Sequence, residues 1–251
     1  MEAILYICHG SRIPRACEEA ISFVRSFMKG RSETIQEYGF LELAEPTIET
    51  AYQRCVEQGA TSITAIPLLL LTAVHAKKDI PGALLALQRH YPNVTLQYGQ
   101  PIGVHPSMVE MIAERIVKTD QPITKNSLIL LVGRGSTDQD VKRDLQEIGR
   151  RLSNRFHGIR VEDCYLTAAE PSFQEMIDHP LLLHEADTVF IMPYLLFSGI
   201  LMDGIKTTVK SAAAISKRKY VLCNYLGYDP KIEAVLTERI DERKAFSFSA
   251  Y

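Results

Sequence analysis

The sequence contains no apolar stretch long enough to cross a membrane as a helix. Its longest apolar run covers residues 65–74 and includes Pro67, whereas a membrane helix needs ~20 apolar residues. The chain opens on a predicted strand and shows no secretory signal. We therefore expect a cytoplasmic protein that does not bind membranes.

Cysteines at metal-binding spacing and an excess of positive charge are also missing. The chain has five cysteines, an odd number, and no two of them form a CxxC pair. This pattern favours reduced thiols and argues against a structural zinc site. The formal net charge of -2 at pH 7 provides no general attraction to nucleic acid, so we expect no nucleic-acid partner.

The hydrophobic pattern alternates between strands and amphipathic helices along the chain. Strands are predicted at 3–8, 36–42, 62–70 and 94–98, and again at 127–132, 160–166, 188–196 and 220–223. Helices predicted between them include 14–28, one that begins at Pro46, 80–90, 108–117, 205–217 and 230–239. Runs such as 188–196 are apolar throughout, which is typical of parallel strands covered on both faces. The pattern predicts an α/β fold.

Landmarks of the first half return in the second half at a nearly constant distance. Residues 9–11, His-Gly-Ser, correspond to 134–136, Arg-Gly-Ser, and residues 44–46 to 169–171, both at an offset of 125 residues. Pro67 corresponds to Pro193 at an offset of 126. We infer an internal duplication, in which each half is a parallel sheet flanked by helices. The predicted halves are 1–117 and 127–251, with a polar linker at 118–126.

Three candidate metal ligands occur in the first half only. The corresponding pairs are His9 and Arg134, Glu42 and Thr167, and His75 and Leu201. His9 directly follows a predicted strand, Glu42 ends one, and His75 lies in the loop after a third. Ligands of open α/β proteins bind at the carboxyl ends of the strands. The pattern therefore predicts a metal site at His9, Glu42 and His75, although a structural imidazole bonded to the backbone is an alternative for His9. Glu45 is expected to cap the helix that follows it.

Basic and hydroxyl side chains at the same strand ends suit an anionic ligand. Arg134 directly follows a predicted strand, where a guanidinium suits a ligand carboxylate. Its alternatives are a solvated loop charge and a phosphate-binding loop, but the GxxxxGK[ST] pattern of such loops is missing. The candidate substrate-binding residues are Ser11, Arg12, Arg134, Ser136, Leu201 and Met202.

Together, these residues resemble the class II chelatases of the CbiX and SirB type, which act on early tetrapyrroles. The resemblance is carried by residues 9–12, by Glu42 with 44–46, by 67–81, and in the second half by 133–136 and 192–199. It covers nearly the whole chain. It implies two similar chelatase halves with the macrocycle between them, and it implies that His9 and His75 handle the metal with Glu42 nearby.

The activity implied by this resemblance is that of a lyase, a metal chelatase that inserts Fe²⁺ into sirohydrochlorin to give siroheme. His9 and His75 would bind the metal and accept the pyrrole protons. Fe²⁺, or else Co²⁺ or Ni²⁺, is then a substrate, and no permanently bound cofactor is expected. An iron–sulfur cluster, which some CbiX relatives carry, is not expected because the chain has no cysteine cluster. Two fused halves make an obligate dimer unnecessary, so we expect a monomer.

Other functions stay open at the level of sequence. A sirohydrochlorin cobaltochelatase would use the same histidines, and so would a non-catalytic carrier of metal or tetrapyrrole. A phosphohydrolase with His9 as nucleophile is a third alternative. That class usually has an arginine immediately before the histidine, whereas Cys8 stands there in this chain.

Overall fold

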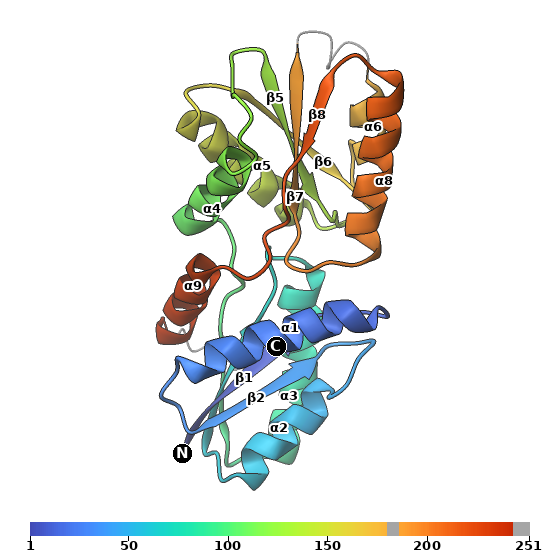
Figure 1. The fold of residues 1–251 in the computed structure, drawn as a ribbon. Helices are drawn as coiled ribbons and strands as arrows, with labels where there is room; N and C mark the ends of the chain where they lie inside the picture. Colours follow the sequence, from blue (N-terminus) through green and yellow to red (C-terminus); the bar gives the residue numbers. More distant parts are fainter. Residues whose placement is uncertain (180–185, 243–251) are drawn as a thin grey trace. The chain divides into compact units, whose positions relative to one another are not determined.

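Two four-stranded parallel sheets lie at the centre of the computed structural model, which describes residues 1–179 and 186–242. Each sheet has helices on both of its faces (Figure 1). The predicted α/β fold in two similar halves is confirmed. Among the described residues, no helix combines the length and the apolar character needed to span a bilayer.

The first sheet has the strand order β2-β1-β3-β4, and all neighbouring strands are parallel. Its strands are β1 (Glu2–Cys8), β2 (Ile35–Phe40), β3 (Ser62–Pro67) and β4 (Thr95–Tyr98). The strand β1 lies between β2 and β3. Because parallel strands end at the same edge of a sheet, side chains that follow these three strands lie near one another.

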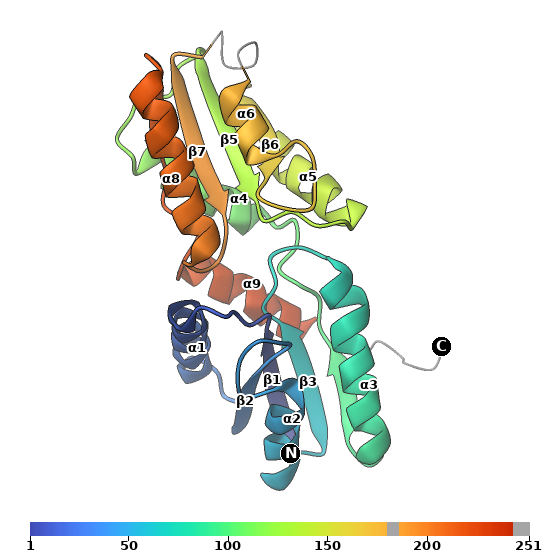
Figure 2. The same cartoon turned by 90° about the vertical axis from the view of Figure 1, so that its right-hand side faces the viewer.

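Helices cover both faces of the first sheet. They are α1 (Pro14–Lys29), α2 (Ile48–Glu57), α3 (Ile80–His90) and, from the end of the chain, α9 (Pro230–Asp241). Leu5 of β1 packs in the core formed with α2 and α3, whereas the ring of Tyr6 packs edge-on against Phe27 of α1. Figure 2 shows α1 and α3 on opposite sides of this sheet. Burial of both faces explains why β1 is apolar throughout.

The second sheet repeats this arrangement with the strand order β6-β5-β7-β8. Its strands are β5 (Ser127–Gly133), β6 (Arg160–Tyr165), β7 (Thr188–Tyr194) and β8 (Lys219–Leu222). Its helices are α4 (Pro106–Val117), α5 (Gln139–Arg155), α6 (Phe173–Asp178) and α8 (Ile200–Ile215). Helices α6 and α8 cover one face, and α4 and α5 cover the other (Figure 1). Helix α8 begins earlier than the predicted residue 205, so Leu201 and Met202 are helical.

The predicted halves and the compact units of the structure differ in the assignment of two helices, α4 and α9. The first unit comprises Met1–Gly103 together with the chain from Ile232, and the second unit comprises Val104–Lys231. Helix α4 therefore belongs to the second unit and α9 to the first. The predicted linker at 118–126 lies inside the second unit, and residues 243–251 of the predicted second half lie outside the described residues.

Helices α4 and α9 each have an arginine that contacts other residues of the same unit. In the second unit, Arg115 of α4 donates to the carbonyl of Leu226 (2.8 Å) and pairs with Asp229 (3.0 Å). In the first unit, Arg239 of α9 donates to the carbonyls of Pro101 (3.0 Å) and Ile102 (2.9 Å). These contacts account for the difference between the predicted halves and the compact units.

The loops that follow β2 and β6 have the same backbone conformation. Leu43 and Ala168 both have positive φ, and the peptide bonds Glu45-Pro46 and Glu170-Pro171 are both cis. The prediction that the next helix begins at Pro46 is wrong. Helix α2 begins at Ile48, and Thr47 caps it by accepting from the N–H of Thr50 (3.1 Å). Glu45 instead accepts from the N–H of Thr47 (3.0 Å), just outside the helix.

Candidate metal centre

His9 and Glu42 are brought together by backbone hydrogen bonds beyond the ends of β1 and β2. The N–H of Leu41 donates to the carbonyl of Cys8 (2.8 Å), and the N–H of Glu42 donates to the carbonyl of His9 (3.1 Å). Gly10 has a φ of 97°, and a Cβ at this position would lie 1.7 Å from the carbonyl oxygen of Glu42. Only glycine allows this close approach. The two loops are therefore held in register with His9 beside Glu42.

His75 is the first residue of a π-helical turn, η1 (His75–Asp79), that leads directly into α3. The N–H of Ile80 donates to the carbonyl of His75, five residues earlier, which is the hydrogen bond that defines such a turn. The prediction placed His75 in a loop after a strand that ended at residue 70. In the structure, β3 ends at Pro67 and His75 is fixed at the start of a helix.

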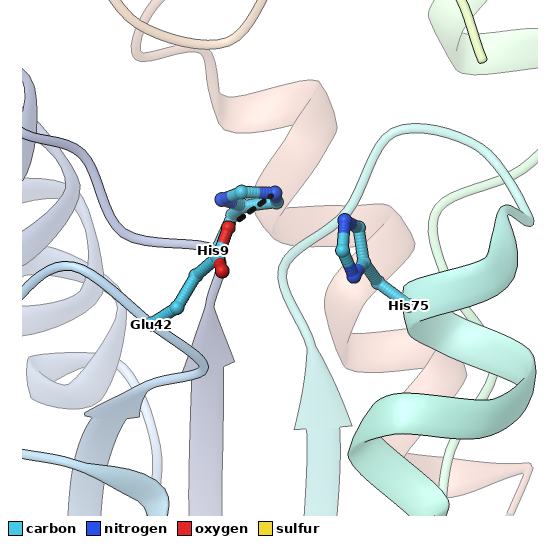
Figure 3. A group of neighbouring side chains, drawn as sticks. All are labelled: His9, Glu42 and His75. Carbon is cyan, nitrogen blue, oxygen red and sulfur yellow. Dashed lines mark ion pairs between the residues drawn. The ribbon is translucent and has the colours of Figure 1, made fainter.

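The three predicted ligands form one cluster within the first unit (Figure 3). The rings of His9 and His75 are perpendicular, with their centroids 4.7 Å apart. Nε2 of His9 lies 3.6 Å from Oε1 of Glu42. One ligand atom from each of the three residues lies within 4.8 Å of the others, a spacing at which one metal ion can contact all three.

Hydrogen bonds assign the tautomer of both imidazoles. Nδ1 of His9 lies 3.2 Å from the carbonyl oxygen of Gly10, and Nδ1 of His75 lies 2.7 Å from Oδ2 of Asp79. Carbonyl and carboxylate oxygens only accept, so each Nδ1 carries a hydrogen, and in a neutral ring the lone pair is then on Nε2. With a neutral His9, its Nε2 and the carboxylate of Glu42 are two acceptors that face each other. A cation satisfies both.

The cluster is partly exposed, and the neighbouring thiol is not part of it. The side chains of His9, Glu42 and His75 are 20%, 47% and 32% exposed, so an ion can reach them from solvent. Cys8 is buried beneath His9, and burial raises the pKa of its thiol to about 12. The group of residues whose ligand atoms lie within 4.8 Å of one another does not include Cys8.

The predicted substrate-binding residues are divided between the two units. Ser11 and Arg12 follow His9 in the first unit. The Oγ of Ser11 accepts a hydrogen bond from the N–H of Ile13 (3.1 Å). In the second unit, the Oγ of Ser136 accepts one from the N–H of Asp138 (3.1 Å). The remaining members, all in the second unit, are Arg134, Leu201 and Met202.

The second-unit members differ in how accessible their side chains are. Arg134 is exposed directly after β5. Leu201 is half-buried against the core of the second unit, in the first turn of α8. Met202 is 3% exposed and packs inside that core, so we remove it from the predicted substrate-binding set. The pattern did not distinguish it from Leu201 because both were expected in a loop.

Two residues beside the cluster, Asp79 and Leu43, were missed by sequence reasoning. Asp79 contacts His75, but its spacing of four residues is informative only on a helix and a loop was predicted there. Leu43 directly follows Glu42 and is 50% exposed with a φ of 64°, and no periodic pattern identifies such an exposed apolar residue. Val74, which directly precedes His75, is also an exposed apolar residue beside the cluster, at 37%.

The amino-acid sequence that forms this cluster matches a known protein family. The CbiX family model matches the chain twice, over residues 3–119 and 128–243. The chain belongs to the CbiX family.

Relatives and a solved structure align with nearly all of the chain. Sirohydrochlorin ferrochelatase of Priestia megaterium is 43% identical over 240 residues, which are 96% of this chain and 90% of that protein. Sirohydrochlorin cobaltochelatase of the same organism is 31% identical over 247 residues, covering 96% and 80%. The structure of SirB from Bacillus subtilis with Fe³⁺ matches with a TM-score of 0.87 at 41% identity, covering 96% and 95%.

Proposed function

We propose that this chain is a sirohydrochlorin ferrochelatase, which inserts Fe²⁺ into sirohydrochlorin to give siroheme. The single observation that carries the proposal is the cluster of His9, Glu42 and His75 at one sheet edge. It occurs in a chain that is 43% identical to a sirohydrochlorin ferrochelatase over almost its full length.

The reaction exchanges two pyrrole protons for one divalent ion. Fe²⁺ enters the macrocycle, two nitrogen–hydrogen bonds break, and two protons leave. A neutral imidazole suits both parts, because it is a good ligand for Fe²⁺ and a base near neutral pH. His9 and His75 hold the ion through Nε2, and the same nitrogens accept the protons as the ion moves into the ring.

Weak and incomplete coordination suits a site that must release its ion. The cluster offers two imidazoles and one exposed carboxylate, so further coordination positions stay open for the macrocycle nitrogens. A thiolate ligand would hold the metal more tightly, but the buried Cys8 is not part of the cluster.

The flat ring of sirohydrochlorin is apolar and has carboxylates along its edge. A binding site for it combines apolar surface with donors at the rim. In the first unit, the exposed side chains of Leu43 and Val74 supply apolar surface beside the cluster. We assign the rim contacts to Ser11, Arg12, Arg134 and Ser136, and a contact with the ring to Leu201.

The test is anaerobic mixing of the purified protein with sirohydrochlorin and Fe²⁺. The expected result is that catalytic amounts of protein accelerate the absorbance change of metal insertion over many turnovers. A metal or tetrapyrrole carrier would bind its ligand without accelerating this change. A rate equal to that of the protein-free reaction would reject the proposal.

The second candidate activity is insertion of Co²⁺, because a cobaltochelatase is 31% identical over 96% of the chain. Nitrogen ligands by themselves do not select Fe²⁺ over Co²⁺ or Ni²⁺. Competition between the three ions at cellular levels decides between the activities, and we expect siroheme as the main product. The three ligands come from one chain, so we also propose that the monomer is active. We further propose that the protein is cytoplasmic.

A further inference from the structure

We propose that Asp79 is a positioning residue that fixes His75 for the metal ion. The inference deepens the proposed function and depends on His75 as a metal ligand. Asp79 itself contributes no ligand atom to the cluster of His9, Glu42 and His75. It acts through the ring of His75.

The contact between the two side chains is short and has a defined chemistry. Oδ2 of Asp79 lies 2.7 Å from Nδ1 of His75. The carboxylate only accepts, so it holds a hydrogen on Nδ1, and in the neutral ring the lone pair is then on Nε2. A carboxylate in this position also fixes the orientation of a metal-binding ring.

Within the described part of the chain, Asp79 makes its side-chain contact with His75. It stands at the N-cap of α3 but makes no side-chain hydrogen bond to that helix. Its side chain is 46% exposed, and exposed ion pairs contribute little to stability. Removal of the carboxylate is therefore expected to change His75 far more than it changes folding.

The π turn that carries this contact contains one residue more than the equivalent segment of the second unit. Buried Ala76 corresponds to buried Met202 at an offset of 126 residues, as do Pro67 and Pro193. Beyond the turn, Ile80 corresponds to Ile205 at an offset of 125, and both are fully buried. One residue has therefore been gained within 77–79.

The second unit lacks both parts of the contact. Leu201 stands in place of His75, and the corresponding helix α8 runs from Ile200 without a π turn. Its positions 204 and 205 are glycine and isoleucine, so no carboxylate occupies the place of Asp79. Extra residues of this kind are frequent at functional sites. Here the extra residue sets Asp79 four positions after His75 instead of three.

The experiment compares Asp79→Ala and Asp79→Asn with a matched control, Asp203→Ala. Asp203 lies in the first turn of α8, is exposed, and pairs with Lys206 at 3.1 Å, so it is an exposed helical aspartate with a charged partner but without a metal-binding histidine. Co²⁺ affinity is measured by titration of the protein alone. The tautomer of His75 is measured by NMR of protein with ¹⁵N-labelled histidine.

The expected result for Asp79→Ala is a loss of Co²⁺ affinity of about 10- to 100-fold, the usual effect of removing a partner of a metal-binding histidine. His75 should also lose its preference for hydrogen on Nδ1. Asp79→Asn retains an acceptor oxygen and should recover part of the affinity, whereas Asp203→Ala should match the parent protein.

Wild-type Co²⁺ affinity with an unchanged tautomer in Asp79→Ala would overturn the inference. An equal loss in Asp203→Ala would also overturn it. Because neither readout involves sirohydrochlorin, the outcome is separate from the proposed activity. If the parent protein binds Co²⁺ but accelerates no insertion, the proposed function fails and the role of Asp79 still stands or falls on these two measurements.

Discussion

At the scale of single residues, the cluster depends on the absence of a side chain at Gly10. The carbonyl oxygen of Glu42 occupies the position that a side chain of residue 10 would take. Gly135 meets the carbonyl of Thr167 in the same way in the second unit, where a Cβ would lie 1.8 Å away. The glycine is therefore part of the duplicated scaffold, and the side chain carried by the residue before it sets the chemistry.

Gly10→Ala is expected to lower the free energy of unfolding by at least about 2 kcal/mol, because it combines a steric clash with an unfavourable φ. Co²⁺ affinity should fall with it, since Glu42 moves away from His9. The control is Gly204→Ala in α8, where a Cβ meets no atom within 4 Å. That change should raise stability by about 0.5–1 kcal/mol. Urea unfolding measures both, and equal stability of the two variants would contradict the argument.

At the scale of secondary-structure elements, equivalent strand ends carry different side chains. The end of β1 presents the imidazole of His9, and the end of β5 presents the guanidinium of Arg134. Both lie on loops with equivalent backbone hydrogen bonds: the N–H of Glu42 donates to the carbonyl of His9 (3.1 Å), and the N–H of Thr167 donates to the carbonyl of Arg134 (2.9 Å). We infer that one scaffold supplies metal chemistry in the first unit and carboxylate binding in the second.

Arg134→Ala is expected to weaken sirohydrochlorin binding about 10- to 100-fold, the loss of about 1.5–3 kcal/mol typical of a charged hydrogen bond. Co²⁺ affinity of the protein alone should not change, because the metal ligands belong to the first unit. Arg143→Ala is the control, since Arg143 is exposed on α5 and pairs with Asp140 and Asp144. Fluorescence titration with sirohydrochlorin provides the affinities. Unchanged affinity in Arg134→Ala would remove Arg134 from the substrate site.

Periodicity predicted most of these elements, and it failed where backbone geometry is set by single contacts. The apolar stripes of α1 and α3 and the apolar runs of β1 and β7 were visible in the sequence, and so were His9, Glu42 and His75. The π turn at His75 was not, because one added residue does not disturb a short apolar stripe. Met202 was misplaced for a related reason: the predicted helix began only at its later, strongly periodic part.

At the scale of the whole molecule, the repeat could not predict that α4 belongs to the second unit and α9 to the first. Each helix has the apolar stripe that either unit could cover, and Pro106 and Pro230 occupy equivalent starts. The partner is selected by contacts far apart in the sequence, such as Arg239 with the carbonyl of Pro101. A repeat therefore identifies equivalent helices without saying which unit each one joins.

Four buried thiols make the stability of the whole chain sensitive to alkaline pH. Burial raises the pKa of Cys8, Cys55 and Cys223 from 9.0 to about 12, and it raises that of Cys164 in the same direction. Between pH 9 and 12 the unfolded chain loses protons that the folded chain keeps. The free energy of unfolding therefore falls as pH rises through this window, by up to about 1.4 kcal/mol per pH unit for each thiol.

Urea unfolding under reducing conditions at pH 8, 9 and 10 checks this dependence. The parent protein should be most stable at pH 8 and progressively less stable at the higher values. Cys223→Ala should show a shallower decline, whatever its stability at pH 8. A free energy of unfolding that stays constant up to pH 10 would show that burial does not hold these thiols protonated.

The most direct test of the account is the rate of Fe²⁺ insertion into sirohydrochlorin by His9→Ala, His75→Ala and the double variant, with His90→Ala as control. His90 is an exposed histidine at the end of α3 that bonds to the carbonyl of Ala86 (2.9 Å). We expect insertion to be lost in the first three variants, sirohydrochlorin still to bind, and His90→Ala to match the parent protein. Normal turnover by the double variant would contradict the assignment of the two imidazoles as the groups that deliver the metal and remove the protons.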